Sequence, residues 1–402
     1  MSEKKRIFIL SHAMELGGAE RSLLGLLDTL KDGEYDIDLF LLRHEGELLK
    51  YIPNHVRLLP AVPEYTVLAR PMKAALREGH ILLTATRFFA RLKAARFTKR
   101  NHLKDSIVSL EYSHKYTCLL MPKIQPETEY DLAISYLTPH YFVAEKVRSK
   151  RKIAWIHTDY SQVSLDIKSE TQMWGRYDQI ISISAEVSKS FLSVFPSLKD
   201  KLLEMENVLP ERLILEQAEA FHVEAEIPKY KGVNLLSIGR FCYAKNFDNI
   251  PDICCRIRAS GIEVKWYLIG YGQDEELIRR KISEAGMEDH VIMLGKKTNP
   301  YPYIKACDLY VQPSRYEGKS VTVREAQLLG KPVAVTAYPT ASSQLVDGFD
   351  GVILPMDNQC CAEAIVELLS RPSKLQLLRN NCRIRDYSNT VDKENLYALL
   401  GE

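Results

Sequence analysis

The 402-residue sequence lacks several features that would place it in a specialised class of protein. No apolar run approaches the roughly 18–20 residues of a transmembrane helix. The charged start, residues 1–6, is followed by the apolar run Ile7–Leu10, which is too short for a signal peptide. The formal net charge of +2 is too small to predict nucleic-acid binding over the whole surface. We therefore expect a cytoplasmic protein.

The cysteines also exclude two classes of site. The chain has eight, including the adjacent pairs Cys254-Cys255 and Cys360-Cys361, but no C-x-x-C spacing. This pattern argues against a disulfide framework and a zinc site, and indicates small buried thiols in a reducing compartment.

What the sequence has is an alternation of β-branched runs and helical stretches, repeated in two halves. The strands expected in the first half are Ile7–Ser11, Ile37–Leu42, Val56–Leu59, Leu132–Tyr136, Ile153–His157 and Ile180–Ile183. Those expected in the second half are Asn234–Ile238, Val264–Ile269, Val291–Leu294, Leu309–Val311 and Val333–Thr336. Such alternation is typical of parallel α/β sheets.

We predict two Rossmann-like, doubly wound domains that face a central cleft. The N-terminal domain is placed at residues 1–207 and the C-terminal domain at 208–380, with the linker running from Asn207 through a charged stretch to Gly232. Residues 381–402 form a helical segment that can return to the N-terminal domain. The carboxyl ends of the parallel strands are the expected ligand-binding edge of each sheet.

The most informative segment is Tyr316–Ala326, in which seven residues separate Glu317 from Glu325. It follows the apolar run Leu309–Val311 and precedes a helical stretch that ends at Gly330. A strand, a tight loop and a helix in this order place two carboxylates around the backbone N–H groups of a helix start, which bind anions. A nucleotide-sugar has the hydroxyls and phosphates that such a site would take.

The chain resembles the family-4 retaining glycosyltransferases of the GT-B fold, over nearly its whole length. The resemblance rests on six motifs in family order: Gly17-Gly18-Ala19-Glu20, Trp155-Ile156-His157-Thr158-Asp159, Ile183-Ser184-Ala185, Ser237-Ile238-Gly239-Arg240 with Lys245-Asn246, Ile269-Gly270-Tyr271-Gly272, and Glu317-x7-Glu325. The run Glu317–Thr322 is similar to the members that build capsule and cell-surface polysaccharides. Many members have an aromatic and a small residue after Gly318, so this departure leaves the donor sugar open.

The resemblance implies a role for each motif residue. Arg240 and Lys245 would neutralise the leaving diphosphate in place of a metal, because guanidinium and ammonium groups both bind phosphate. Glu317 would contact the donor sugar beside the reacting carbon, and His157 would lie close to the sugar and phosphates. We count these four as the candidate catalytic residues. Each has a plainer interpretation, as a solvated loop residue or a structural histidine.

Further residues are expected to bind the donor. Glu325 would accept hydrogen bonds from the ribose hydroxyls, or it would only complete a capping box with Thr322 in the first turn of its helix. Backbone N–H groups would hold the distal phosphate at Gly318, Lys319, Ser320, Val321 and Thr322. Gly17 and Gly18, which are not the G-x-G-x-x-G fingerprint of nicotinamide cofactors, would face the phosphates from the other domain.

The resemblance and these residues together imply a retaining, metal-independent transferase that needs no cofactor. It would move a hexose-type sugar from a nucleotide donor, UDP being the expected nucleotide, to a cell-surface polysaccharide or lipid-linked glycan. The first domain would bind the acceptor. A catalytically inactive partner subunit and a nucleotide-sugar epimerase of the same fold remain alternatives.

A basic stretch at residues 68–104 indicates a further partner. It contains one acid, Glu78, and ten basic residues: Arg70, Lys73, Arg77, Arg87, Arg91, Lys93, Arg96, Lys99, Arg100 and Lys104. Apolar residues are interleaved with them: Leu82, Leu83, Phe88, Phe89, Leu92 and Phe97. A helix of this composition can lie on an anionic membrane surface. It can equally pack on the first sheet with a solvated basic face. Nucleic acid is not expected, because no known binding module frames the patch.

Overall fold

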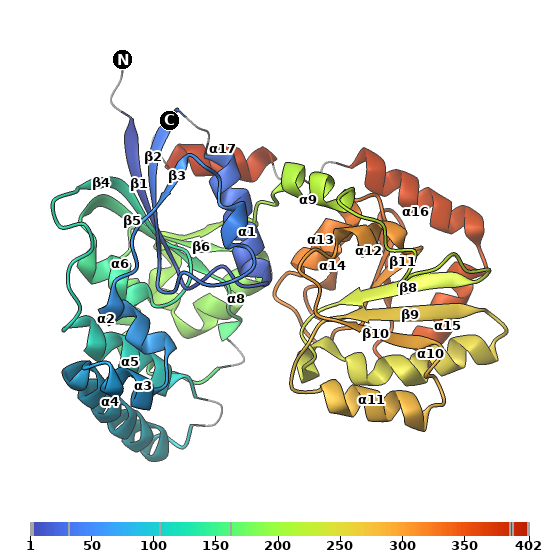
Figure 1. Ribbon diagram of the computed structural model, residues 1–402, viewed down its shortest axis with the longest axis horizontal. Coiled ribbons are helices and arrows are strands. Elements are labelled where there is room, and N and C mark those ends of the chain that lie inside the picture. Colours follow the sequence, from blue (N-terminus) through green and yellow to red (C-terminus); the bar gives the residue numbers. More distant parts are fainter. Residues whose placement is uncertain are drawn as a thin grey trace. The chain divides into compact units, whose positions relative to one another are not determined.

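The computed structural model describes residues 4–30, 33–103, 106–160, 163–385, 387 and 390–399. The chain divides into two compact units (Figure 1). The first contains Met1–Val208 and Thr390–Glu402, and the second contains Leu209–Asn389. The predicted domain boundary at residues 207 and 208 lies one residue from this division, and the helical segment predicted from residue 381 divides at residue 389.

The first unit is built on a parallel sheet with, in the described part of the chain, the strand order β3-β2-β1-β4-β5-β6-β7. The strands are β1 (Lys5–Ser11), β2 (Tyr35–Leu41), β3 (Val56–Leu58), β4 (Tyr130–Ser135), β5 (Ser149–Ile156), β6 (Gln179–Ser182) and β7 (Leu202–Glu204). Strand β1 pairs Ile7 with Ile37 of β2 on one side and with Leu132 of β4 on the other. Its continuous apolar sequence fits a strand that is buried on both faces.

Helices connect these strands and cover both faces of the sheet. They are α1 (Gly18–Thr29), α2 (Pro63–Thr66), α3 (Met72–Arg77), α4 (Ile81–Arg100), α5 (Val108–Cys118), α6 (His140–Lys146), α7 (Ile167–Trp174) and α8 (Ala185–Val194). The last helix of the chain, α17 (Thr390–Leu399), also belongs to this unit. There Tyr397 donates to the carbonyl of Thr29 at 3.0 Å, and Arg151 donates to the carbonyl of Leu399 at 2.8 Å.

The second unit has a parallel sheet whose described strands follow the order β10-β9-β8-β11-β12-β13. They are β8 (Val233–Ile238), β9 (Val264–Ile269), β10 (Val291–Gly295), β11 (Leu309–Gln312), β12 (Val333–Thr336) and β13 (Gly351–Leu354). Strand order reverses between β8 and β11, which is the switch point where open α/β sheets bind ligands.

Two layers of helices enclose this second sheet. The helices are α9 (Glu211–Ala218), α10 (Ile250–Ala259), α11 (Glu275–Glu284), α12 (Tyr301–Ala306), α13 (Val321–Leu328), α14 (Ala341–Gln344), α15 (Asn358–Leu369) and α16 (Pro372–Ile384). Side chains of α10, α11 and α15 form the core on one face. Side chains of α9, α12, α13 and α14 form it on the other.

The predicted linker, residues 207–232, is wrong in extent. Leu209, Ile214, Val223 and Ile227 are all buried in the second unit's core. Helix α9 lies within this stretch, and its apolar side chains recur at helical spacing among exposed charges. The charges that suggested a linker are therefore the solvent face of a helix that packs on the sheet.

No helix in the described part of the chain is both long enough and apolar enough to span a membrane.

Candidate active site

Glu317 lies in the loop after β11, and three side chains donate to one oxygen of its carboxylate. Its Oε1 accepts from Lys245 Nζ at 2.5 Å, from Ser314 Oγ at 2.7 Å and from Gln312 Nε2 at 3.3 Å. The side chains of Lys245 and Glu317 are only 21% and 10% exposed. A shielded, charge-assisted contact of this kind is stronger than a surface ion pair. The structure thus brings two of the predicted site residues together.

Polar side chains at the carboxyl end of β11 hold this loop in place. Gln312 accepts from Tyr310 OH at 2.8 Å and donates to Ser314 Oγ at 2.9 Å. Thr336, on the neighbouring strand β12, donates to the carbonyl of Ser314 at 2.6 Å. Gln312 and Ser314 were not predicted from the sequence as site residues. The available signal was a polar Gln-x-Ser pair directly after an apolar strand.

The two predicted cations follow β8. Lys245 ends a short 3₁₀ turn, Tyr243–Lys245, and its stem runs beside Gly239, where a Cβ atom would lie 3.3 Å from Lys245 Cδ. Arg240 is exposed and makes no ion pair or hydrogen bond with the rest of the described chain. Lys245 is therefore already paired with Glu317, whereas Arg240 keeps its guanidinium for a ligand.

The glycines after β9 allow two loops to touch. A Cβ atom at Gly270 would lie 1.9 Å from the carbonyl oxygen of Gly239, and one at Gly272 would lie 2.2 Å from that of Phe241. Only glycine permits backbone contact this close. The motif Ile269-Gly270-Tyr271-Gly272 thus shapes the loop of Arg240 by packing against it.

Glu325 lies deeper than the sequence indicates. Helix α13 begins at Val321, so Glu325 is its fifth residue and not part of the first turn. The capping box with Thr322 is wrong, because the N-cap is Ser320 and no side chain caps this helix. Glu325 is fully buried and accepts from Tyr301 OH at 2.9 Å. Its role toward a ribose stays a prediction.

The loop before α13 offers fewer backbone donors than expected. The N–H of Ser320 donates to Gln344 Oε1 at 2.7 Å, and Gln344 Nε2 donates back to the carbonyl of Ser320 at 3.0 Å. In this conformation the Ser320 N–H is taken by Gln344, and its role toward a phosphate stays a prediction. Gly318, Lys319, Val321 and Thr322 are half-buried around it.

In the first unit, Gly17 and Gly18 lie where predicted, at the start of α1. Gly17 is the N-cap with extended backbone angles, and Gly18 is the first helical residue. The carboxylate of Glu20 folds over Gly17, with Oε2 only 2.1 Å from the place of a Cβ atom. The fourth residue of this motif thus lies beside its glycine pair.

His157 follows β5, and its ring lies 4.9 Å from that of Tyr136, which follows β4. Burial lowers the pKa of His157 to about 4, so the imidazole is neutral near pH 7. Its Nε2 is buried and has no partner in the described part of the chain. These features fit a neutral hydrogen-bonding group better than a group that holds positive charge beside a diphosphate.

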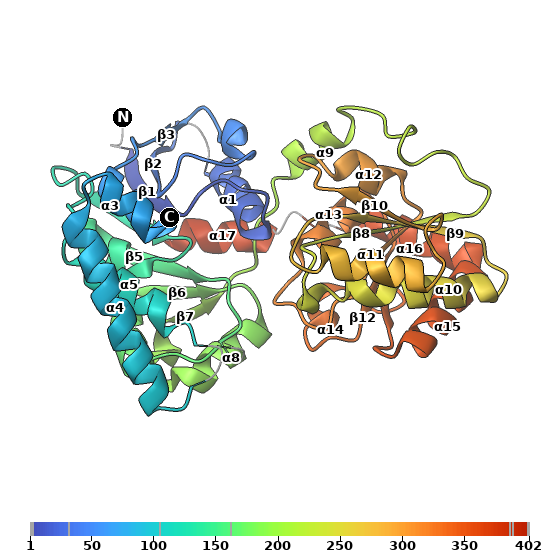
Figure 2. The same ribbon diagram turned by 60° about the horizontal axis from the view of Figure 1, so that its bottom comes forward.

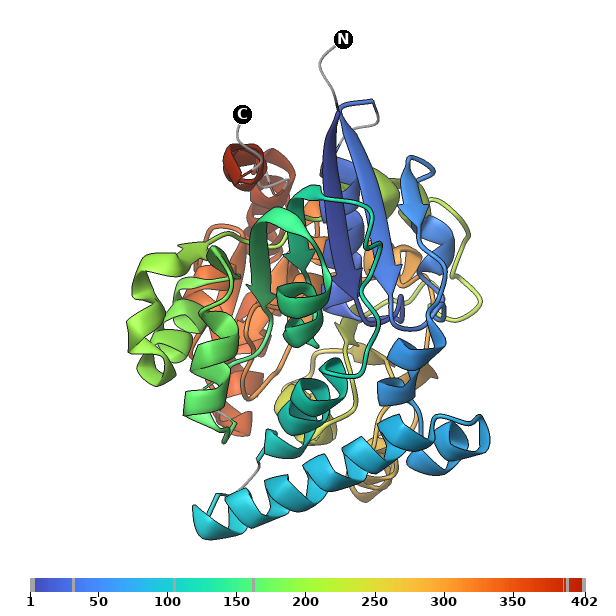
Figure 3. The same cartoon turned by 90° about the vertical axis from the view of Figure 1, so that its left-hand side faces the viewer.

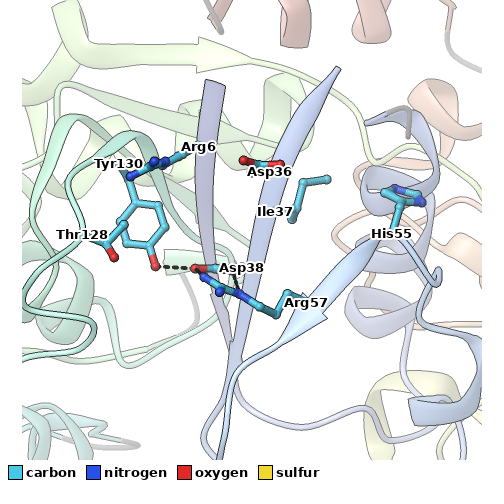
Figure 4. A pocket seen from close by; sticks show the side chains of 8 residues that line it. All are labelled: Arg6, Asp36, Ile37, Asp38, His55, Arg57, Thr128 and Tyr130. Atoms are coloured by element: carbon cyan, nitrogen blue, oxygen red, sulfur yellow. Dashed lines mark hydrogen bonds and ion pairs between the residues drawn. The ribbon is translucent and has the colours of Figure 1, made fainter. Parts of the chain in front are cut away.

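A cavity of about 480 Å³ lies at the edge of the first sheet where its strands begin, away from their carboxyl ends. Figure 4 shows side chains from the amino-terminal ends of β1 to β4 around it. Asp38 accepts from Arg57 Nε and Nη2, both at 2.6 Å, and from Tyr130 OH at 2.6 Å. The buried carboxylate is thus saturated by its neighbours, and none of the predicted site residues lines this cavity.

The basic stretch forms α3, α4 and the loops around them, with Lys104 outside the described residues. Figures 2 and 3 show α4 on the outer side of the first unit, with α5 between it and the sheet. Ala90 and Ala94 pack with Val108 and Tyr112 of α5. The opposite face carries large apolar side chains that are exposed by 46–66%: Ile81, Leu82, Phe88, Phe89 and Leu92.

This arrangement corrects the expected distribution of the basic stretch. Leu83 is buried, and Phe97 faces Tyr112 with ring centroids 6.1 Å apart. Arg87 turns inward to the carbonyls of Val67 and Arg70. The exposed face of α4 is therefore apolar toward its start and basic toward its end, rather than having the two kinds of residue interleaved along its whole length.

No group of three or more potential metal ligands occurs among the residues that the structure describes. The thiols of all eight cysteines are free, and five of them are buried, with Cys360 exposed.

The two sheets and their connections define the class of protein: the chain has the GT-B fold of glycosyltransferases. It superimposes on the HepE protein of Anabaena, solved in complex with UDP-glucose, with a TM-score of 0.68 and 15% sequence identity. The match covers 98% of this chain and 99% of that one. At this identity the likeness establishes the fold alone.

Sequence comparison is more specific for the second unit. Residues 221–385 match the family model described as glycosyl transferases group 1. Over 128 residues the chain is 31% identical to the lipopolysaccharide core biosynthesis mannosyltransferase LpsB of Rhizobium meliloti. Over 126 residues it is 26% identical to a Campylobacter jejuni N-acetylgalactosaminyltransferase whose name specifies a diphospho-undecaprenol acceptor.

These matches cover 31% of this chain in both cases, and 36% and 34% of the two relatives. The stretch that matches the family model includes Arg240, Lys245, Glu317 and Glu325, and all four lie in the second unit.

Proposed function

We propose that the protein is a retaining, metal-independent glycosyltransferase of family 4. It transfers a hexose-type sugar from a nucleotide donor, UDP-linked, to a cell-surface polysaccharide of the capsule type or to a lipid-linked glycan. The observation that carries this proposal is the Lys245–Glu317 pair at the carboxyl edge of the second sheet, with the unpaired Arg240 in the preceding loop. The edge lies at the switch point of the sheet.

The cations suit the leaving group of this reaction. When the bond between the sugar carbon and the diphosphate breaks, negative charge grows on the diphosphate oxygens. Arg240 can grip two of those oxygens, and Lys245 has two N–H groups left after its bond to Glu317. In the proposal these groups supply the positive charge that a metal supplies in other phosphate sites.

Glu317 suits the sugar. Within the described chain the hydrogen bonds to its carboxylate all go to Oε1, which leaves Oε2 as an acceptor for a sugar hydroxyl. A fixed carboxylate beside the reacting carbon also stabilises positive charge that develops there. The proposal gives Glu317 positioning and electrostatic work, and no covalent step.

Donor binding and product stereochemistry test the proposal. The purified protein should bind and slowly hydrolyse a UDP-sugar in a panel of UDP-, GDP- and ADP-sugars. Proton NMR of the first-formed sugar or glycoside should show the anomeric configuration of the donor. An inverted product would refute the retaining mechanism. Failure to bind any of the three nucleotide classes would indicate an inactive partner subunit.

We further propose that α4 holds the protein on the anionic inner face of a membrane, with the rest in the cytoplasm. Its exposed large apolar residues lie on one side of the helix, since Ile81, Phe88 and Leu92 are spaced by seven and four positions. Acids are absent from this described helix, and its second half exposes Arg91, Lys93, Arg96, Lys99 and Arg100. Apolar insertion beside basic residues is the pattern of an interfacial helix.

Vesicle sedimentation distinguishes this role from nonspecific adsorption to lipid. The protein should bind phosphatidylglycerol vesicles at low salt and phosphatidylcholine vesicles much less. Replacing Leu82 and Phe89 by Ser should abolish most of the binding. Leu377→Ser, which changes a residue 53% exposed in the second unit, serves as the matched control and should leave binding intact. Absence of binding to anionic vesicles at low salt would refute the proposal.

A further inference from the structure

Arg315, two residues before Glu317, grips the loop that carries Lys245. Its guanidinium donates to both carboxylate oxygens of Asp248, each at 2.9 Å, and to the carbonyl of Tyr243 at 2.6 Å. Its backbone N–H donates to the carbonyl of Ala244 at 2.8 Å. Four hydrogen bonds thus join a single residue of one loop to both sides of Lys245 in the other.

The contact between Arg315 and Asp248 is largely shielded from solvent, and its geometry is specific. The side chains of Arg315 and Asp248 are only 19% and 18% exposed. The guanidinium carbon also lies 4.2 Å from the centroid of the Tyr243 ring. A planar, forked cation that stacks on an aromatic ring and holds a carboxylate at two points fixes an orientation that lysine cannot reproduce.

Asn246 forms a second hydrogen-bonded link between the same two loops. It is buried, it has left-handed backbone angles (φ 61°, ψ 24°), and its Nδ2 donates to the carbonyl of Pro313 at 2.8 Å. Asn249 donates to Asn246 Oδ1 at 2.6 Å. Lys245 therefore stands between two anchored points, which limits where its flexible stem can start.

We propose that the Arg315–Asp248 pair positions Lys245 against Glu317 and thereby sets the phosphate-binding geometry of the site. The inference rests on the proposed function for its catalytic meaning. Arg315 acts through the loop and is not itself a phosphate ligand, since Asp248 and the carbonyl of Tyr243 already take three of its five N–H groups. It is a positioning residue for the donor site.

The alternative is that the pair only stabilises the second unit. Another forked pair in the same unit provides the control, because Arg258 donates to both oxygens of Glu263, at 2.7 and 3.3 Å. Arg258 lies near the end of α10, at the other edge of the sheet from Lys245. A purely structural contribution would make the two pairs equivalent.

Two measurements on the full-length protein test the proposal. The first is the affinity for UDP by calorimetry. Arg315→Ala should weaken binding by about 10- to 100-fold, the order of loss that follows when a binding group is displaced. Arg315→Lys should recover only part of the loss, and Arg258→Ala should match the wild type. Arg315→Ala should add nothing further in a Lys245→Ala background, because its effect passes through Lys245.

The second measurement needs no ligand. Amide hydrogen exchange in residues 243–249 should accelerate in Arg315→Ala and stay unchanged in Arg258→Ala. Additive losses in the double variant, or unchanged exchange in this loop, would overturn the positioning role. If the wild-type protein binds no UDP, GDP or ADP, the proposed function fails instead, and the exchange result alone decides whether Arg315 orders the loop.

Discussion

The two oxygens of the Glu317 carboxylate have different surroundings. One oxygen is held by Lys245, Ser314 and Gln312, and the other has no protein partner in the described part of the chain. Glu325, eight positions later, is fully buried against Tyr301. The two acids that look alike in sequence therefore meet different surroundings, and they should fail in different ways when they are replaced.

Replacing each acid by its amide should separate these roles. Glu317→Gln removes the charge beside the reacting carbon and should lower kcat by about 10²- to 10³-fold, with a smaller change in donor affinity. Glu325→Gln keeps a side chain of the same size and should weaken donor binding more than it lowers kcat. Steady-state kinetics with calorimetric binding of UDP measures both. Equal losses of donor affinity alone would contradict this division.

Gly17 gives a test in the first unit. Its φ of −138° and ψ of 160° are allowed for alanine, and the atom that blocks a Cβ is the mobile end of Glu20. Gly17→Ala should therefore leave the melting temperature almost unchanged. If a diphosphate approaches this backbone as predicted, the same change should lower kcat/KM by about tenfold or more. Unchanged kcat/KM would show that Gly17 serves only the turn.

At this scale the sequence named Lys245 and Glu317 as residues of one candidate site but did not predict the contacts that surround them. The Lys245–Glu317 contact joins residues 72 positions apart, and no local pattern could reveal it. The capping box at Thr322 was a reasonable local interpretation. It fails because the N-cap is Ser320 and the helix starts at Val321, two residues earlier than that motif requires.

Among the elements, α5 and α7 present an unusual pairing of acids. Glu111 and Glu170 are both buried, and Glu170 accepts from Tyr141 OH at 2.7 Å. Burial, followed by the charge of Glu170, raises the pKa of Glu111. Burial likewise raises the pKa of Glu170, which the hydrogen bond from Tyr141 and the nearby Lys115 oppose. At least one proton is therefore retained in this pair well above the usual range of a carboxylic acid.

The raised pKa of Glu111 should make the stability of the first unit depend on pH. A carboxyl group with a raised folded-state pKa ionises first in the unfolded chain, so its contribution is lost as the pH rises from about 4.5 through the folded-state value. Glu111→Gln, which cannot ionise, should stabilise the protein at pH 8.5 by about 1–3 kcal/mol. The advantage should vanish near pH 4. Urea unfolding at the two pH values measures it, and an equal effect at both would contradict the explanation.

The elements themselves were largely predictable. The strands Val264–Ile269 and Val333–Thr336 coincide with their predictions, because an apolar, β-branched run buried on both faces is a strong local signal. The short strands β7 and β13 were missed. β7 has only three residues at the sheet edge, and β13 begins at a glycine. The exposed apolar face of α4 was also not predicted. Residues that are interleaved in the sequence are divided between a buried and an exposed face only when the helix packs on α5.

For the whole molecule, the last helix links the end of the chain to the first unit. Leu396 and Leu399 of α17 are buried, and Tyr397 bonds to the carbonyl of Thr29. Leu396→Ala should lower the stability of the first unit by about 2–4 kcal/mol, because it leaves a cavity. Hydrogen exchange resolved by segment should show the loss in the core strands β1 and β4 and not in β8 or β11. An equal loss in both units would contradict separate cores.

The two parallel-sheet units can be predicted from the sequence alone, because strand and helix signals are local and repeat along the chain. The residue types of the candidate site can be predicted in the same way, since phosphate and hydroxyl recognition require cations and carboxylates. Three features emerge only from the folded structure: Lys245 contacts Glu317, Arg315 bonds to the loop that carries Lys245, and Glu325 is buried. Those facts depend on contacts between distant segments, which the packing of whole elements creates and no local pattern records.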